Sequence, residues 1–172
     1  MVAFELAQRG DLPALHALIE RAYRGDAARA GWTHEADLLD GQRIDLALLA
    51  EILADPDQRL IVAHDGGTII GCVNLRRSAP DRCYLGLVTV DPARQASGLG
   101  RRLLAAAEDA ARAMGAAVVE MTVIARRPEL VAWYERRGYA LTGERRPFPL
   151  DDPRFGLPRT RDLDFVVLER RL

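Results

Sequence analysis

Apolar residues follow two spacings along the chain, and each spacing predicts a different kind of element. Recurrence every three or four residues predicts helices over 11–25, 44–53, 98–114 and 128–137. Alternation or short β-branched runs predict strands over 2–7, 59–64, 68–75, 84–90, 117–124, 139–142 and 163–168. Strands interleaved with helices indicate an α/β protein whose mixed sheet carries helices on its faces.

Glycine and proline residues mark where these elements stop. The segment Asp65-Gly66-Gly67 predicts the turn of a hairpin, and Pro92 ends the strand before it because proline cannot donate to a sheet ladder. Gly115 and Gly138 stand where the two later helices are expected to end. The stretch 24–43 is too irregular for an assignment, and its large polar residues favour a wall of a substrate site.

Composition narrows the class of protein. With 172 residues, 49% of them hydrophobic, the chain is expected to form one domain over 1–172. Its 24 basic and 25 acidic residues leave a net charge of -1, which gives no footprint for nucleic acid or an anionic membrane. Without a signal-like N-terminus or a long apolar run, a soluble cytoplasmic protein with a small-molecule partner is expected. Cys72 and Cys83 match no disulfide or metal spacing and are expected to be reduced core residues.

The junction after Val90 carries the clearest chemical signal, the stretch Gln95-Ala96-Ser97-Gly98-Leu99-Gly100. Glycines let the main chain approach a ligand, and the N-terminus of the following helix attracts an anion such as a phosphate. Arg101 and Arg102 oppose the helix dipole unless an anion lies nearby. A plain glycine loop with solvated arginines is the alternative.

Two other phosphate-binding motifs occupy the same kind of junction, but the residues here do not match them. A P-loop requires Lys-Ser/Thr after its last glycine, whereas Arg101 and Arg102 follow Gly100. A dinucleotide fingerprint needs a third glycine and an acidic residue about 20 residues later. Glu120 lies at a suitable distance, but 103–107 supplies no glycine, so both motifs are disfavoured.

The stretch Gln95-x-x-Gly98-x-Gly100, directly after a strand that ends in Val-x-Val-Asp-Pro, resembles the acyl-coenzyme A signature of the GCN5-related N-acetyltransferase (GNAT) family. A second stretch, Tyr134-Glu135-Arg136-Arg137-Gly138-Tyr139, is similar to the family's Tyr-Glu-x-x-Gly-Phe/Tyr segment and follows in the right order. The resemblance covers roughly residues 60–142. It implies an α/β (α+β) fold with a mixed, mostly antiparallel twisted sheet of about seven strands flanked by about four helices.

The same resemblance implies acetyl-coenzyme A as cosubstrate, no metal, and acetyl transfer to a primary amine of a small or amino-acid-like acceptor. An acyl-coenzyme A sensor and a peptide or protein N-acetyltransferase stay open. The cofactor would lie where the strands ending at Val90 and beginning near Val118 splay apart, with the pantetheine arm on Val88 and Val90. The expected cofactor-binding residues are Val88, Thr89, Val90, Gln95, Ala96, Ser97, Gly98, Leu99, Gly100, Arg101 and Arg102.

Tyr134 is the expected catalytic residue. Attack of an amine on a thioester releases a thiolate, and a phenol within hydrogen-bond reach can protonate it. The resemblance gives the family counterpart of Tyr134 that role. The alternative is packing, because Leu130, Trp133 and Tyr134 share one helix face.

The base that deprotonates the amine is less well defined. Glu120 leads because it shares a strand face with Thr122 near the expected thioester, while Glu35 or His34 could approach from the early loop. Arg127 stands where many family members have an Asn, so it is either a solvated cation or a contact to cofactor phosphates or an acidic substrate.

Acceptor specificity is expected to reside in the irregular segments. The stretch 147–153 is interrupted by prolines and is compatible with packing, a substrate lid or a contact in a homodimer. The candidate wall residues are Trp32, Glu35, Phe148, Phe155 and Arg159.

Overall fold

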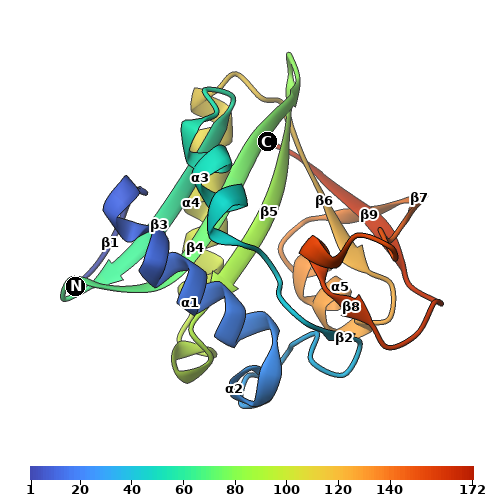
Figure 1. The fold of residues 1–172 in the computed structure, drawn as a ribbon. Helices are drawn as coiled ribbons and strands as arrows, with labels where there is room; N and C mark the ends of the chain where they lie inside the picture. The colour runs from blue at the N-terminus through green and yellow to red at the C-terminus, as the bar shows by residue number, and fades with distance from the viewer.

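The computed structural model describes residues 1–172 and contains a seven-stranded sheet in the order β1-β3-β4-β5-β6-β9-β7 (Figure 1). Every neighbouring pair is antiparallel except β5 and β6, which run parallel. A separate antiparallel pair joins β2 (Leu39–Asp40) to β8 (Leu157–Pro158). The strands of the large sheet are β1 (Val2–Leu6), β3 (Gln58–Asp65), β4 (Thr68–Ala79), β5 (Arg82–Val90), β6 (Val118–Ile124), β7 (Ala140–Pro147) and β9 (Asp164–Arg171).

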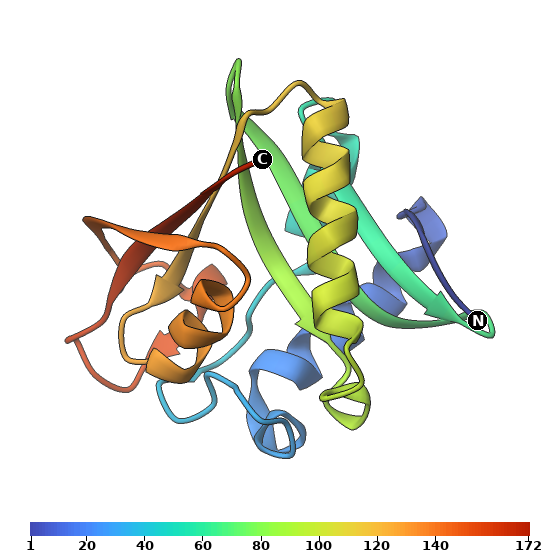
Figure 2. The ribbon, with the colours of Figure 1, turned by 180° about the vertical axis from the view of Figure 1, so that it is seen from behind.

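Helices cover both faces of this sheet. Figure 1 shows α1 and α3 in front of β3, β4 and β5, and Figure 2 shows α4 and α5 on the opposite side of the molecule. The predicted mixed, mostly antiparallel fold is therefore confirmed, with one helix more than the expected four. The additional helix, α2, lies in the stretch that the sequence pattern left unassigned. The helices are α1 (Leu12–Tyr23), α2 (Gly25–Arg29), α3 (Leu46–Ala54), α4 (Leu99–Ala113) and α5 (Pro128–Glu135).

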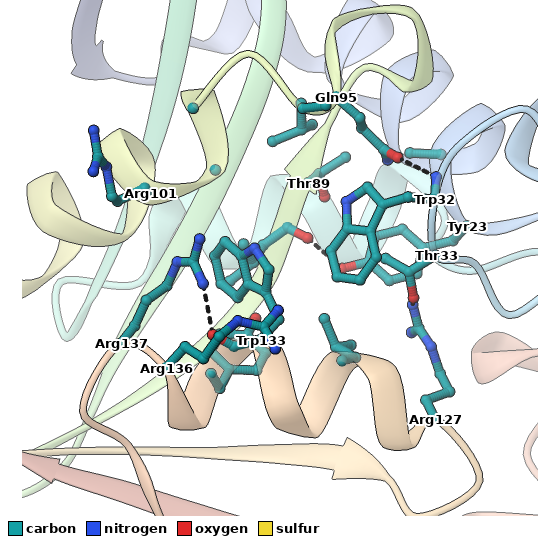
Figure 3. A pocket seen from close by; sticks show the side chains of 18 residues that line it. Tyr23, Trp32, Thr33, Thr89, Gln95, Arg101, Arg127, Trp133, Arg136 and Arg137 are labelled. Atoms are coloured by element: carbon teal, nitrogen blue, oxygen red, sulfur yellow. Dashed lines mark hydrogen bonds between the residues drawn. The ribbon is translucent and has the colours of Figure 1, made fainter.

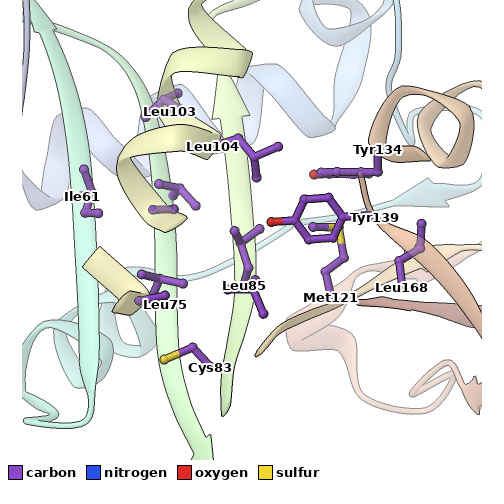
Figure 4. Close-up of a cluster of buried hydrophobic side chains, with 14 of the residues drawn as sticks. Ile61, Leu75, Cys83, Leu85, Leu103, Leu104, Met121, Tyr134, Tyr139 and Leu168 are labelled. Carbon is purple, nitrogen blue, oxygen red and sulfur yellow. The ribbon is translucent and has the colours of Figure 1, made fainter. Parts of the chain in front are cut away.

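Two apolar clusters hold the layers together. On one face, Leu103 and Leu104 of α4 pack with Leu85 of β5 and Tyr139, as Figure 4 shows. On the other face, Leu15 of α1 and Leu49 of α3 pack with the residues of β3 and β4 that point to that side, among them Val62 and Cys72. Because burial of apolar surface drives folding, the period of three and four residues in α4 decides which side of this helix meets the sheet.

The strands β5 and β6 separate after a short stretch of pairing. They pair only over Arg82–Tyr84 and Val118–Glu120. Beyond this point β5 carries a bulge, because the three steps from residue 86 to 89 lie opposite the two steps from 74 to 72 on β4. Leu87, within the bulge, adopts a positive φ of 52°. The end of β5 therefore lacks a strand partner on the β6 side, which is the splay that the family resemblance implies.

The structure also locates the predicted turns and cysteines. Cys72 and Cys83 are both buried and free, as expected. Gly66 and Gly67 have positive φ values in the β3–β4 turn. No helix of the protein combines the length and the apolar character needed to cross a membrane.

Gly71 on β4 lies where α4 and β5 come close together. A Cβ at this position would lie 2.7 Å from Cδ1 of Leu103 and 2.9 Å from the backbone oxygen of Thr89. Gly71→Ala is therefore expected to lower the free energy of unfolding by about 1–3 kcal/mol, measured by urea denaturation. Gly10→Ala is the control, because a Cβ there meets nothing within 4 Å. Equal stability of both variants would contradict the close packing.

Candidate active site

A cavity of about 600 Å³ opens where β5 leaves β6, between the start of α4 and the helix α5 (Figure 3). Val88, Thr89 and Val90 form one of its walls. The N–H of Asp91 donates to the oxygen of Ile70 on β4 at 2.9 Å. Because successive residues of a strand face opposite sides, the main-chain groups of Val90 and Val88 point away from β4, toward the cavity.

The first turn of α4 forms the second wall. Ala96 and Gly98 adopt left-handed φ values of 64° and 79°, and this turn brings Gly98, Gly100 and Arg101 to the cavity. The N–H groups at the start of α4 have no partner inside the helix, so they form an anion-binding end. A Cβ on Gly100 would lie 3.3 Å from the ring of Trp133, so a larger residue there would require this ring to shift.

Positive charge gathers around this first cavity. Its lining includes Arg101, Arg127, Arg136 and Arg137 and no carboxylate. Nε of Arg137 is buried without a hydrogen-bond partner, and burial together with the charges of Arg136 and Arg101 lowers the Arg137 pKa. Such a lining fits a ligand with several negative charges, for example one that carries phosphate groups as coenzyme A does.

Most of the predicted cofactor residues line this cavity, but three do not. Ser97 donates its hydroxyl to the oxygen of Arg94 at 2.6 Å, and Leu99 points into the core. Arg102 lies over the ring of Phe4 at 5.1 Å, on the far side of α4. The prediction that Arg102 assists Arg101 is not supported by this geometry, because consecutive helix residues point about 100° apart.

Tyr134 lies at the inner end of the first cavity, as predicted, and is 5% exposed. Its ring meets those of Trp133 and Tyr139 edge to face, with centroids 4.9 and 5.8 Å away. Burial raises the pKa of Tyr134 well above its ordinary value, so the phenol keeps its proton at neutral pH. No side chain of the protein forms a hydrogen bond with the Tyr134 hydroxyl. This oxygen is also not completely buried.

A second cavity, of about 480 Å³, adjoins the first. The residues that line both cavities are Tyr23, Val88, Arg127, Leu130 and Tyr134. Here the Tyr23 hydroxyl donates to the oxygen of Val88 at 2.7 Å, and Tyr84 and Thr122 share a hydrogen bond of 2.6 Å. Tyr134 therefore lies at a junction between an anion-binding cavity and a second, separate one.

A buried ion-pair group forms one wall of the second cavity. Glu35 accepts from Arg24 and, at 3.2 Å, from Arg127, and both arginines are 6% exposed. Arg127 also donates to the Thr33 hydroxyl at 2.8 Å. Burial would raise the pKa of Glu35, but the charges of Arg127 and Arg24 outweigh it and hold that pKa below its ordinary value. Arg127 is thus neither solvated nor free to bind a distant phosphate.

The candidate base Glu120 lies outside both cavities. It sits where β5 and β6 are still paired, opposite Tyr84, and its carboxylate binds Arg82 at 3.3 Å and Arg146 at 2.9 Å. Its neighbour Thr122, one step beyond the paired stretch, does line the second cavity. A shared strand face was the wrong guide, because the splay begins between these two residues.

The predicted wall residues are distributed over different places. Phe148 and Phe155 line the second cavity together with Glu35, whereas Trp32 lines the first. The N–H of Trp32 donates to Oε1 of Gln95 at 2.8 Å, which ties the early loop to the loop before α4 (Figure 3). Arg159 lies in neither cavity, because it pairs with Asp40 at 2.7 Å across β2 and β8.

Four residues of the second cavity carry no signal in the sequence. They are Tyr23, Arg43, Arg76 and Tyr84, which come from α1, the loop between β2 and α3, β4 and β5. No pair of them shares a motif, so only the fold brings them together. His34, the other candidate base, accepts from the N–H of Ala36 and lines neither cavity.

Comparison with known proteins agrees with this architecture. Residues 13–139 match the model of the acetyltransferase (GNAT) family. The chain is 29% identical over 130 residues to an IAA acetyltransferase of Azospirillum brasilense, covering 75% of this chain and 77% of that protein. It is 34% identical over 99 residues to the N-alpha-acetyltransferase RimI of Mycobacterium tuberculosis, covering 56% and 61%.

The fold is shared with solved acetyltransferase structures. A structure from Salmonella typhimurium, which contains acetyl-CoA, superimposes with a TM-score of 0.73 at 19% identity, covering 100% of this chain and 94% of that one. Because the family model spans residues 13–139, more than half of the chain, the chain belongs to the GNAT acetyltransferase family. Membership makes it an acetyl-CoA-dependent N-acetyltransferase by class.

Glu35→Gln removes the counter-charge of two buried guanidinium groups. The free energy of unfolding at pH 7 is expected to fall by about 3–5 kcal/mol, measured by urea denaturation. Because the folded-state pKa of Glu35 lies below its ordinary value of 4.5, its contribution is present above that value and lost as the pH falls through the folded pKa. The gap between wild type and variant should therefore shrink in acid.

The control is Asp37→Asn, which breaks an exposed ion pair with Arg29 at 3.0 Å. It is expected to change stability much less, because solvent and salt screen such pairs. A gap for Glu35→Gln that stays constant down to acidic pH would contradict the role of the Glu35 charge.

Proposed function

We propose that this protein transfers the acetyl group of acetyl-CoA directly to the primary amine of a small, amino-acid-like molecule in the cytoplasm. The observation that carries the proposal is the meeting of two cavities at Tyr134. One cavity suits a polyanionic cosubstrate and the other an uncharged or anionic acceptor. The buried free thiols Cys72 and Cys83 fit a reducing compartment.

The first cavity offers the groups that would hold acetyl-CoA, whose thioester supplies the acetyl group and a thiolate leaving group. Val88 and Val90 lie on the strand edge that lines this cavity, and the Val88 oxygen already accepts from Tyr23. The start of α4 with Arg101 offers N–H groups and charge to phosphates. The acetyl-CoA in the Salmonella typhimurium structure, which has the same fold, supports this assignment.

Tyr134 is the proton donor in this proposal, and two properties of its side chain support the role. Its raised pKa keeps the phenol protonated, and its hydroxyl is not engaged by another side chain. Tyr134 Oη can therefore donate a proton to a departing sulfur at the junction of the cavities.

The amine loses its proton without a carboxylate base. Glu35 is the only acidic residue that lines the second cavity, and two arginines already hold its charge. Four arginines line the same cavity, and their excess positive charge lowers the pKa of an acceptor ammonium group. Water then suffices to accept the proton.

A peptide N-terminus is the second candidate acceptor, and the similarity to RimI favours it. The wall of the second cavity argues for a smaller acceptor. Arg24 donates to the oxygen of Phe155 at 2.9 Å and fixes the segment that contributes Phe148, Pro149 and Phe155 to that wall. An enclosing segment leaves less room for an extended chain than for a single amino-acid-like molecule.

Acetyl-CoA is expected to raise the unfolding temperature, because a ligand that binds only the folded state stabilises it by about 2.7 kcal/mol at a hundredfold its Kd. Arg101→Ala should raise Kd about tenfold. Arg102→Ala is the matched control, because Arg102 lies on the far side of α4 and should leave Kd unchanged. No thermal shift at millimolar acetyl-CoA, or equal effects of both variants, would contradict the cofactor site.

Tyr134→Phe is expected to lower kcat about a hundredfold while the thermal shift with acetyl-CoA remains, because only the proton donor is lost. The assay measures release of free thiol over a panel of primary amines. Tyr139→Phe is the matched control, because its hydroxyl binds Glu108 at 3.0 Å away from the cavities. Cofactor binding without thiol release on any amine would instead support a sensor.

A further inference from the structure

The second cavity carries more positive than negative charge. Its lining contains four arginines, Arg24, Arg43, Arg76 and Arg127, and a single acid, Glu35. Arg24 and Arg127 bind Glu35. The other two guanidinium groups, of Arg43 and Arg76, form no ion pair in the space proposed for the acceptor. The charge of Arg43 acts on Glu35 and that of Arg76 on Asp55, but neither acid lies within ion-pair distance of these two groups.

Neither of these two groups is engaged by the rest of the protein. Arg43 and Arg76 take part in no ion pair, and their guanidinium groups donate no hydrogen bond to another residue. Each lies instead over the ring of a tyrosine that lines the same cavity, Arg43 at 5.1 Å from the Tyr23 centroid and Arg76 at 5.5 Å from that of Tyr84. Stacking of this kind fixes the plane of a guanidinium and leaves its N–H edge open.

Arg43 lies close to the reaction centre. Tyr23, on which it stacks, reaches the oxygen of Val88 with its hydroxyl, and both residues line the two cavities where they meet. Arg43 thus stacks on a residue that lines the junction of the two cavities. The charge of Arg43 also acts on Glu35, so three guanidinium groups surround one carboxylate.

We propose that Arg43, assisted by Arg76, binds a carboxylate group of the acceptor, so that the substrates are α-amino acids with an apolar side chain. This inference rests on the proposed acetyl transfer. A planar guanidinium with an open N–H edge binds a carboxylate through two parallel hydrogen bonds. In an α-amino acid the amine is two bonds from the carboxyl carbon, which fits the short path from Arg43 to the junction.

The remaining lining specifies the rest of the acceptor. Leu48, Ile52, Met121, Phe155 and Phe165 give the cavity an apolar wall, which suits an aliphatic or aromatic side chain. A polyamine is disfavoured, because its additional ammonium groups would face the uncompensated arginines. A peptide N-terminus has an amide in the place where the free amino acid has a carboxylate. A peptide would therefore provide no negative charge to pair with Arg43.

The test compares L-leucine with L-leucinamide as acceptors of the wild-type enzyme and of Arg43→Gln. The variant should raise KM for leucine tenfold or more, the loss of about one charge-assisted hydrogen bond pair. KM for leucinamide should change less than about twofold. The rise in unfolding temperature caused by acetyl-CoA should stay the same. Comparing wild type and variant at one pH cancels the different amine pKa values of the two acceptors. Arg112→Gln, on the exposed face of α4, is the control for loss of a positive charge.

A second measurement does not depend on the variant being folded. For the wild-type enzyme, 4-methylpentanoate, which is leucine without its amine, should inhibit competitively against the acceptor, and 4-methylpentanamide should not. Equal effects of Arg43→Gln on leucine and leucinamide, or equal inhibition by acid and amide, would overturn the inference while acetyl transfer stands. Failure to acetylate any amine would refute the proposed function itself.

Discussion

The separation of β5 from β6 is the constraint on which the site depends. A regular sheet would pair both strands along their length and leave no free backbone groups between them. Here β5, which has a bulge around Leu87, leaves β6 after three paired residues, so Val88 and Val90 have no strand partner on the β6 side. The oxygen of Val88 is bound by the Tyr23 hydroxyl instead. The cavities, the position of Tyr134 and the entry of α4 all follow from this single departure from regular pairing. Figure 1 shows the divergence of β5 from β6, and the irregular pairing on β5 accompanies the opening that the cavity occupies.

The two cavities differ in the charged groups that line them. The first cavity combines a helix N-terminus with several arginines and no acid, whereas the second holds Glu35 between two of its four arginines. Arg127 borders both, since it joins the loop at Thr33 and Glu35 to the start of α5. A buried ion pair of this kind contributes little net stability, but it fixes the positions of the groups that it joins.

Elements with a strong local signal could be predicted from the sequence, whereas contacts between distant segments could not. The apolar period of α4 and the glycines before it predicted both the helix and its anion-binding end, because these properties are local. Tyr134 could be placed through a second motif. Glu120 was misplaced because strand alternation says which face a residue occupies, but not where two strands part. Arg43 and Tyr23 could not be found, since their stacking depends on how α1 meets the following loop.

The loop around residues 31–35 touches both cavities through different atoms. At one end the N–H of Trp32 binds Gln95, and at the other Glu35 binds Arg24 and Arg127. Whatever orders the first contact thus also restricts the second, because only two residues separate them. Binding free energies that share such a segment are linked, and linkage is reciprocal. The affinities for the two substrates of this enzyme would then be coupled, equally in both directions, through a loop of a few residues.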